Sequence, residues 1–173
     1  MIRPATRDDL TEIENSYNEH FEYEAAHGAF TVFKKGIYPT RNDAEKALKA
    51  NSLYVYEENG MICGSVIIDK VQPPEYAKIS EFESTPADKV LVIHLLMVRP
   101  KMKGNGIGAT LVHFAVYLAK ELGCKVVRLD TGSQNVPAVS LYKKHGFIVK
   151  AEKAMKVGGA IQHTGHLFLE YKL

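Results

Sequence analysis

The chain has 173 residues, 46% of them hydrophobic, and its 22 basic and 20 acidic residues leave a net charge of +2. This length suits a single domain, residues 1–173, that buries about 70% of the surface of its unfolded chain. The balanced charge, with no block of Lys or Arg, argues against direct binding of nucleic acid.

Only two cysteines are present, which gives neither a disulfide framework nor a closely spaced pair of metal ligands. The first ten residues contain no apolar segment of signal-peptide length. The longest apolar run, at residues 90–98, is interrupted by His94 and is too short to span a bilayer. We therefore expect a soluble, cytoplasmic protein with no membrane partner.

The N-terminal part of the chain predicts a short edge strand at residues 2–5, followed by two helices. Thr6 is expected to cap a first helix that ends near Glu19, because acidic residues in the first turn suit the helix dipole. Thr40 is expected to cap a second helix that ends near Asn51.

An antiparallel hairpin is predicted over residues 52–69, because Asn59 and Gly60 form a dipeptide in which both residues tolerate positive φ. The run at residues 90–98 is apolar on both faces, as expected of a strand in the middle of a sheet. Apolar residues at steps of three or four then indicate a helix over residues 107–122.

The rest of the chain predicts a strand at residues 124–131, a short helix at 137–145 and two final strands at 147–154 and 166–173. Between those two strands, Met155 to Gly165 is expected to be a mobile rim of the site. The predicted fold class is α/β (α+β): a mixed, mostly antiparallel sheet of about six to seven strands flanked by about four helices.

Three glycines, Gly104, Gly106 and Gly108, lie between the strand at 90–98 and the helix that follows it. Such a turn leaves backbone N–H groups free at a helix N-terminus, which favours a phosphate ligand over a merely tight connection. A P-loop is excluded because Ala109 and Thr110 stand where Lys and Ser or Thr are needed.

A dinucleotide fingerprint fits the same turn, since Gly104, Gly106 and Ala109 match G-x-G-x-x-A and Asp130 follows about twenty residues later. However, the sequence predicts only one βαβ unit, whereas a dinucleotide-binding fold needs several in succession. A dinucleotide-binding reductase is therefore the runner-up interpretation.

A second motif, "NVPAVSLYKKHGF" at residues 135–147, distinguishes the two interpretations. Together with Lys103, Gly106 and Gly108, it resembles the GNAT superfamily of N-acetyltransferases, whose signature is Q/R-x-x-G-x-G/A followed about thirty residues later by N-x-x-A-x-x-L-Y-x-x-x-G-F. The second part is matched by Asn135, Ala138, Leu141, Tyr142, Gly146 and Phe147. Lys103 departs from the usual Gln or Arg.

The resemblance implies the GNAT fold, with acetyl-CoA as co-substrate and no metal. It implies that the pyrophosphate is held by Lys103, Gly104, Asn105, Gly106, Ile107, Gly108 and Ala109. It further implies that Leu96, Met97 and Val98 pair with the pantetheine arm where their strand diverges from its neighbour, with the Leu96 amide facing the thioester oxygen. Asn135 would bind the coenzyme, and Tyr142 would protonate the departing thiolate.

A general base is expected because an alkylamine with a pKa of about 10 is almost wholly protonated at pH 7. Asp130 and His94 are the main candidates, with Glu81 and Glu83 as alternatives. The acceptor amine is expected near residues 17–38, where Glu19, Glu22 and Glu24 lie among aromatic residues. His163 and His166 lack a nearby carboxylate or thiol in the sequence and are not interpreted as metal ligands.

The sequence thus predicts transfer of an acetyl group from acetyl-CoA to a primary amine, on a small molecule or a protein N-terminus, by direct attack in a ternary complex. Two alternatives remain open: a non-catalytic acyl-CoA-binding sensor and, below it, the dinucleotide-binding reductase. A homodimer is compatible with the resemblance.

Overall fold

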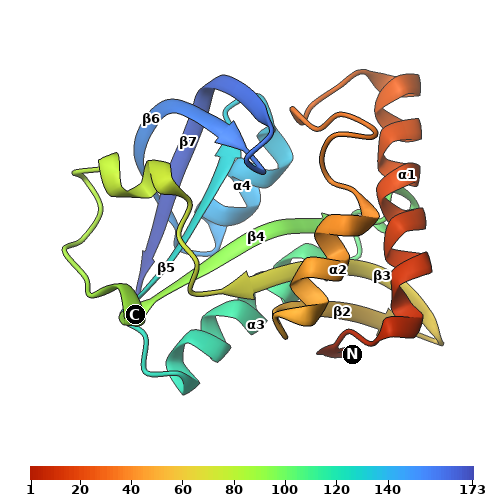
Figure 1. Cartoon of the computed structure of the whole chain (residues 1–173), viewed down its shortest axis with the longest axis horizontal. Helices are drawn as coiled ribbons and strands as arrows, with labels where there is room; N and C mark the ends of the chain where they lie inside the picture. Colours follow the sequence, from red (N-terminus) through yellow and green to blue (C-terminus); the bar gives the residue numbers. More distant parts are fainter.

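A seven-stranded mixed sheet forms the centre of the computed structural model, which describes residues 1–173 (Figure 1). Its strand order is β1-β2-β3-β4-β5-β7-β6, and all neighbours are antiparallel except the parallel pair β4 and β5. The strands are β1 (Ile2–Pro4), β2 (Leu53–Glu58), β3 (Met61–Asp69), β4 (Val90–Val98), β5 (Val126–Gly132), β6 (Ile148–Val157) and β7 (Ile161–Lys172). The predicted mixed, mostly antiparallel sheet is confirmed.

Four helices cover the sheet: α1 (Leu10–His27), α2 (Arg41–Lys49), α3 (Ile107–Glu121) and α4 (Val136–Lys144). Figure 1 shows α1 and α2 in front of β2 and β3, with α3 behind these strands. The core is divided accordingly. Apolar residues of α1 and α2 pack on one face of the sheet, and those of α3 pack on the other. None of the helices combines the length and the apolar character needed to cross a membrane.

Local sequence explains where α2 begins and how the chain turns between β2 and β3. The Asp43 carboxylate accepts hydrogen bonds from the Thr40 amide at 2.7 Å and the Thr40 hydroxyl at 3.0 Å, at the N-terminus of α2. Asn59 and Gly60 have φ values of 51° and 75°, as the tight turn between β2 and β3 requires.

Helix α1 is longer than the sequence predicted. It continues past Glu19 to His27 and ends at Gly28, whose φ is 95°. The sequence did not predict this continuation because the buried face of the helix carries the polar residues His20 and Glu24. The pattern of apolar residues therefore ends before the helix does.

The last two strands are also longer than the sequence predicted, and they include most of the segment from Met155 to Gly165 that was expected to be a mobile rim. Residues 155–165 belong to an antiparallel hairpin in which Met155 pairs with His163 and Val157 pairs with Ile161. The short turn between β6 and β7 contains Gly158 and Gly159, both with positive φ. This hairpin lies at the end of the sheet beside β5 and forms one wall of the site described below.

Candidate active site

The site begins where β4 and β5 diverge. Their parallel pairing covers only Val90–Val92 against Val126–Arg128, although both strands continue beyond it. Leu95 has a φ of 45°, and the pairing of β4 with β3 shifts register between Ile67 and Ser65, so β4 bends at this point. Beyond the bend lies a cleft of about 860 Å³, lined by residues of β4, β5, α1, α3 and α4.

The glycine turn lies at one end of this cleft. Gly104 and Gly106 have φ values of 83° and 75°, and neither has an atom within 4 Å of the position that a Cβ would occupy. The first hydrogen bond of α3 runs from the Thr110 N–H to the Gly106 carbonyl at 3.0 Å, so the preceding amides have no partner within the helix. The turn therefore presents open backbone donors at a helix N-terminus, which suits an anion.

Most of the residues that the resemblance placed at the coenzyme line the cleft, and they include all three glycines and Leu96, Met97 and Val98. The exception is Asn105. Its side-chain amide donates to the Met102 carbonyl at 3.0 Å, and the residue is exposed. The edge of β4 that faces β5 has no strand partner beyond Val92. That edge is free to pair with an extended ligand.

Lys103 reaches across the cleft to the C-terminal end of α1. Its Nζ lies 4.4 Å from the centroids of both the Tyr23 and the Phe30 rings, a geometry that allows cation–π attraction to each. Burial lowers the pKa of Lys103. The lysine thus links the glycine turn to the α1 side of the cleft.

Helix α4 contributes Asn135 and Tyr142. The Asn135 Oδ1 accepts a hydrogen bond from the Ala138 N–H at 3.3 Å, which caps the helix and leaves the side-chain amide as a free donor. Tyr142 is 6% exposed and packs edge-on against Phe147. Burial, followed by the negative charge of Asp130, raises the pKa of Tyr142, so its hydroxyl is protonated at neutral pH and can act as a proton donor.

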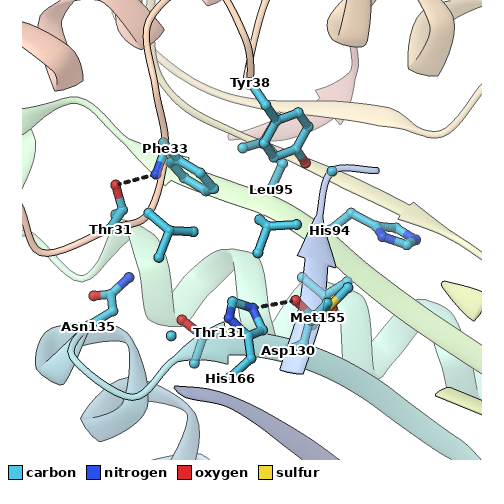
Figure 2. Close-up of a pocket in the computed structure, with 15 residues that line it drawn as sticks. Thr31, Phe33, Tyr38, His94, Leu95, Asp130, Thr131, Asn135, Met155 and His166 are labelled. Carbon is cyan, nitrogen blue, oxygen red and sulfur yellow. Dashed lines mark hydrogen bonds and ion pairs between the residues drawn. The ribbon is translucent and has the colours of Figure 1, made fainter. Parts of the chain in front are cut away.

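A smaller cavity of about 90 Å³ adjoins the cleft (Figure 2). Figure 2 shows Thr31, Phe33 and Tyr38 on one side of it and Asp130 and His166 on the other. The two cavities share the lining residues Thr31, Phe33, Ile93, Leu95, Asp130, Thr131 and Asn135. The two cavities are therefore adjacent.

Asp130 is the only carboxylate that lines the small cavity, and it belongs to a hydrogen-bonded chain. Its Oδ2 accepts from the Tyr76 hydroxyl at 2.7 Å, and its Oδ1 lies 2.9 Å from His166 Nε2. The His166 Nδ1 in turn lies 3.0 Å from His163 Nδ1. Only one of the two facing Nδ1 atoms can carry a proton. When Asp130 is ionised, His166 donates from Nε2 to Asp130 and accepts at Nδ1 from the Nδ1–H of His163.

The other candidate bases do not belong to this hydrogen-bonded chain. His94 lines the small cavity, but its Nε2 pairs with Asp69 Oδ1 at 2.9 Å, and Figure 2 shows its ring directed away from Asp130 and His166. Glu81 and Glu83 line neither cavity and lie near Lys153 and Lys172 respectively.

The predicted cluster of acidic residues on the α1 side does not present a free carboxylate to the cleft. Glu24 accepts from the Phe30 amide at 2.6 Å, the Thr31 amide at 2.8 Å and the Thr31 hydroxyl at 2.7 Å. Burial acts to raise its pKa, but these hydrogen bonds and the nearby His20 outweigh it, and the pKa is lowered. Glu24 therefore holds the loop after α1 in place, while Glu22 is exposed.

Sequence reasoning missed Tyr76 and Tyr38 and dismissed His166. His166 contacts Asp130 because β5 and β7 pair with Gly132 opposite His166. Tyr76 comes from the segment between β3 and β4 and is 54 residues from Asp130 in the chain. No local motif marks either contact; the strand register could have indicated His166, and no sequence signal indicates Tyr76.

A cleft between diverging strands, with an open glycine turn and a neighbouring cavity that contains Asp130, suits an extended, anionic ligand. Residues 9–147 match the model of the Acetyltransferase (GNAT) family. The chain belongs to this family.

Two curated relatives are similar along most of this chain. The uncharacterized N-acetyltransferase MJ1207 of Methanocaldococcus jannaschii is 31% identical over 152 residues, which cover 84% of this chain and 59% of that protein. The chain thus spans less than two thirds of that relative. The L-amino acid N-acyltransferase MnaT of Escherichia coli is 26% identical over 155 residues, which cover 87% of this chain and 81% of that protein.

Among solved structures, yncA of Salmonella typhimurium, crystallised with acetyl-CoA, has a TM-score of 0.71 at 22% identity. The match covers 100% of this chain and 93% of that one. At this identity the likeness concerns the fold, and it confirms the predicted GNAT fold class.

Proposed function

We propose that residues 1–173 form one acetyl-CoA-dependent N-acetyltransferase domain that acetylates a primary amine by direct attack in a ternary complex. The observation that carries this proposal is the adjacency of the two cavities. The cleft with the glycine turn and the small cavity share lining residues of β4 and β5. A thioester bound along β4 and an amine at Asp130 would therefore meet.

The cleft has the features that the coenzyme needs. The open amides from Gly104 to Ala109 would hold the pyrophosphate, and each hydrogen bond to a charged oxygen contributes about 1.5–3 kcal/mol. The helix dipole adds only about 0.3–1 kcal/mol, so the convergent amides dominate. The free edge of β4 at Leu96–Val98 would pair with the amides of the pantetheine arm.

Three residues that line the cleft would move the protons of the transfer. Asp130 takes one proton from the ammonium group, and the free amine then forms the new bond to the thioester carbonyl carbon. The Leu96 N–H stabilises the oxyanion, and Tyr142 protonates the sulfur as the carbon–sulfur bond breaks. An oxyanion donor of this kind contributes about 10²–10³ in rate. The second proton of the nitrogen then restores Tyr142, and Asp130 releases its proton to water, so that one proton is set free in each turnover.

Direct attack is supported by the state of the two cysteines. Cys63 and Cys124 are both buried and line neither cavity. Burial raises the pKa of Cys63, which keeps it as a thiol. Neither residue is placed to carry an acetyl group between the two substrates.

The acceptor has two candidate classes within this proposal. The name of MnaT makes amino acids one class, and simple amines or a protein N-terminus make the other. The dinucleotide-binding alternative loses support, because β4 and β5 form the only parallel pair of the sheet, whereas a dinucleotide-binding fold needs several βαβ units in succession. An activity assay distinguishes the alternative of a non-catalytic acyl-CoA sensor from the proposed enzyme. Release of free thiol from acetyl-CoA, dependent on an added amine, supports transfer, whereas tight binding of acetyl-CoA without turnover by any amine would favour the sensor.

A further inference from the structure

We infer that the acceptor is a small primary amine that carries no carboxylate or other acidic group. This inference rests on the proposed acetyl transfer and names the class of its acceptor. It is carried by the charges and the size of the small cavity.

The charges of the cavity suit a cation. Its lining contains no Lys or Arg, and Asp130 is its only carboxylate. A carboxylate has about four lone-pair sites, and Tyr76 and His166 use two, so Asp130 can still accept from an ammonium group. The amine would arrive as that ammonium group, because it is protonated at neutral pH.

A second, anionic group on the acceptor would find no cationic partner in the lining of this cavity. Both histidines of the lining already face carboxylates, His94 facing Asp69 and His166 facing Asp130. The buried guanidinium of Arg128, two residues before Asp130 on β5, is bound to Glu170 at 2.7 Å. The carboxylate of an amino acid would therefore be desolvated beside the negative charge of Asp130 with only neutral donors, such as the Asn135 amide, to bind it.

The size of the cavity sets a second limit. A cavity of about 150 Å³ holds one benzene ring, so about 90 Å³ holds a group of roughly four non-hydrogen atoms. On one side the Tyr38 ring packs directly on Gly158, with no room for a Cβ between them. This contact joins the loop after α1 to the β6–β7 turn and closes that side of the cavity. The acceptor is thus a compact amine rather than a peptide chain.

A matched pair of acceptors separates charge from size. L-alanine carries a carboxylate where L-alaninol carries a neutral hydroxymethyl group. Both compounds present a primary amine on the same carbon. Thiol release from acetyl-CoA would be measured with each, with L-phenylalaninol as the larger analogue and an alanyl peptide as the surrogate of a protein N-terminus. We expect kcat/KM for L-alaninol to exceed that for L-alanine at least tenfold, and L-phenylalaninol and the peptide to be poorer than L-alaninol.

The inference is overturned if L-alanine or the peptide is used as well as L-alaninol or better, and the proposed transfer then still stands. If acetyl-CoA binds and no acceptor of the panel releases thiol, the transfer itself fails. Calorimetric titration provides a readout that does not depend on turnover. L-alaninol titrated into the protein saturated with CoA should bind at least tenfold more weakly to Asp130→Asn than to the wild type, and equal binding would contradict the pairing of the amine with Asp130.

Discussion

Replacing Asp130 with Asn tests the assignment of the base with almost no change of shape. The substitution removes the negative charge and the ability to take a proton. A positioned general base contributes about 10²–10⁴ in rate, so kcat should fall by that factor. The KM for acetyl-CoA should change little, because the hydrogen bonds of Asp130 are to Tyr76 and His166 and not to the glycine turn.

The cost to stability can be worked from the two hydrogen bonds of Asp130, at 2.7 Å to Tyr76 and 2.9 Å to His166. Bonds to a charged group contribute about 1.5–3 kcal/mol and neutral bonds about 0.5–1.5 kcal/mol. The Tyr76 hydroxyl can rotate and His166 can change tautomer to satisfy an amide. The free energy of unfolding should therefore fall by about 1–3 kcal/mol, far too little to unfold most of the protein at assay temperature.

The assay is amine-dependent thiol release, with thermal unfolding of each variant measured beside it. His94→Gln is the matched control, because it removes the other candidate base from the lining of the same cavity. We expect His94→Gln to retain most of the wild-type kcat. If Asp130→Asn keeps kcat within about threefold while His94→Gln loses a hundredfold, the reasoning is refuted and His94 is the base.

Three further outcomes are expected. Tyr142→Phe should lower kcat about 100-fold with little change in thermal stability, and an unchanged kcat would remove its role as the acid. Lys103→Met should raise the KM for acetyl-CoA several-fold, because it removes the positive charge beside the glycine turn; an equal KM would contradict a role in binding. Burial lowers the pKa values of His20, His145 and His163, so the unfolded chain binds more protons as pH falls below about 6.5. Tm should therefore decrease between pH 7 and pH 5.5, whereas an increase would contradict this linkage.

Features set by neighbouring residues could be predicted from the sequence. The Asn59–Gly60 turn, the stripe of α3 and the glycine turn each depend on a few consecutive residues, and each lies where the sequence placed it. The residues around Asn135 and Tyr142 likewise line the cleft, because one short helix positions both. In these segments local preference and the final fold agree.

The acceptor side could not be predicted in the same way. Asp130 and His166 are 36 residues apart in the chain and meet through the β5–β7 register, which a shift of one residue would reverse. Glu24 appeared in the sequence as a free acidic residue, but the loop that follows α1 folds back and donates three hydrogen bonds to it. Long-range pairing of this kind leaves no periodic signal.

The central claim is that the glycine turn grips the pyrophosphate of acetyl-CoA, and calorimetric titration of two alanine variants tests it most directly. Gly106 and Gly60 have the same φ of 75°, and neither has an atom within 4 Å of an added Cβ, but only Gly106 lines the cleft. Either substitution should cost about 1–2 kcal/mol of stability through backbone strain. We predict that Gly106→Ala raises the Kd for acetyl-CoA at least tenfold and that Gly60→Ala leaves it unchanged. Equal affinities of both variants and the wild type, or no binding of acetyl-CoA by the wild type, would contradict the claim.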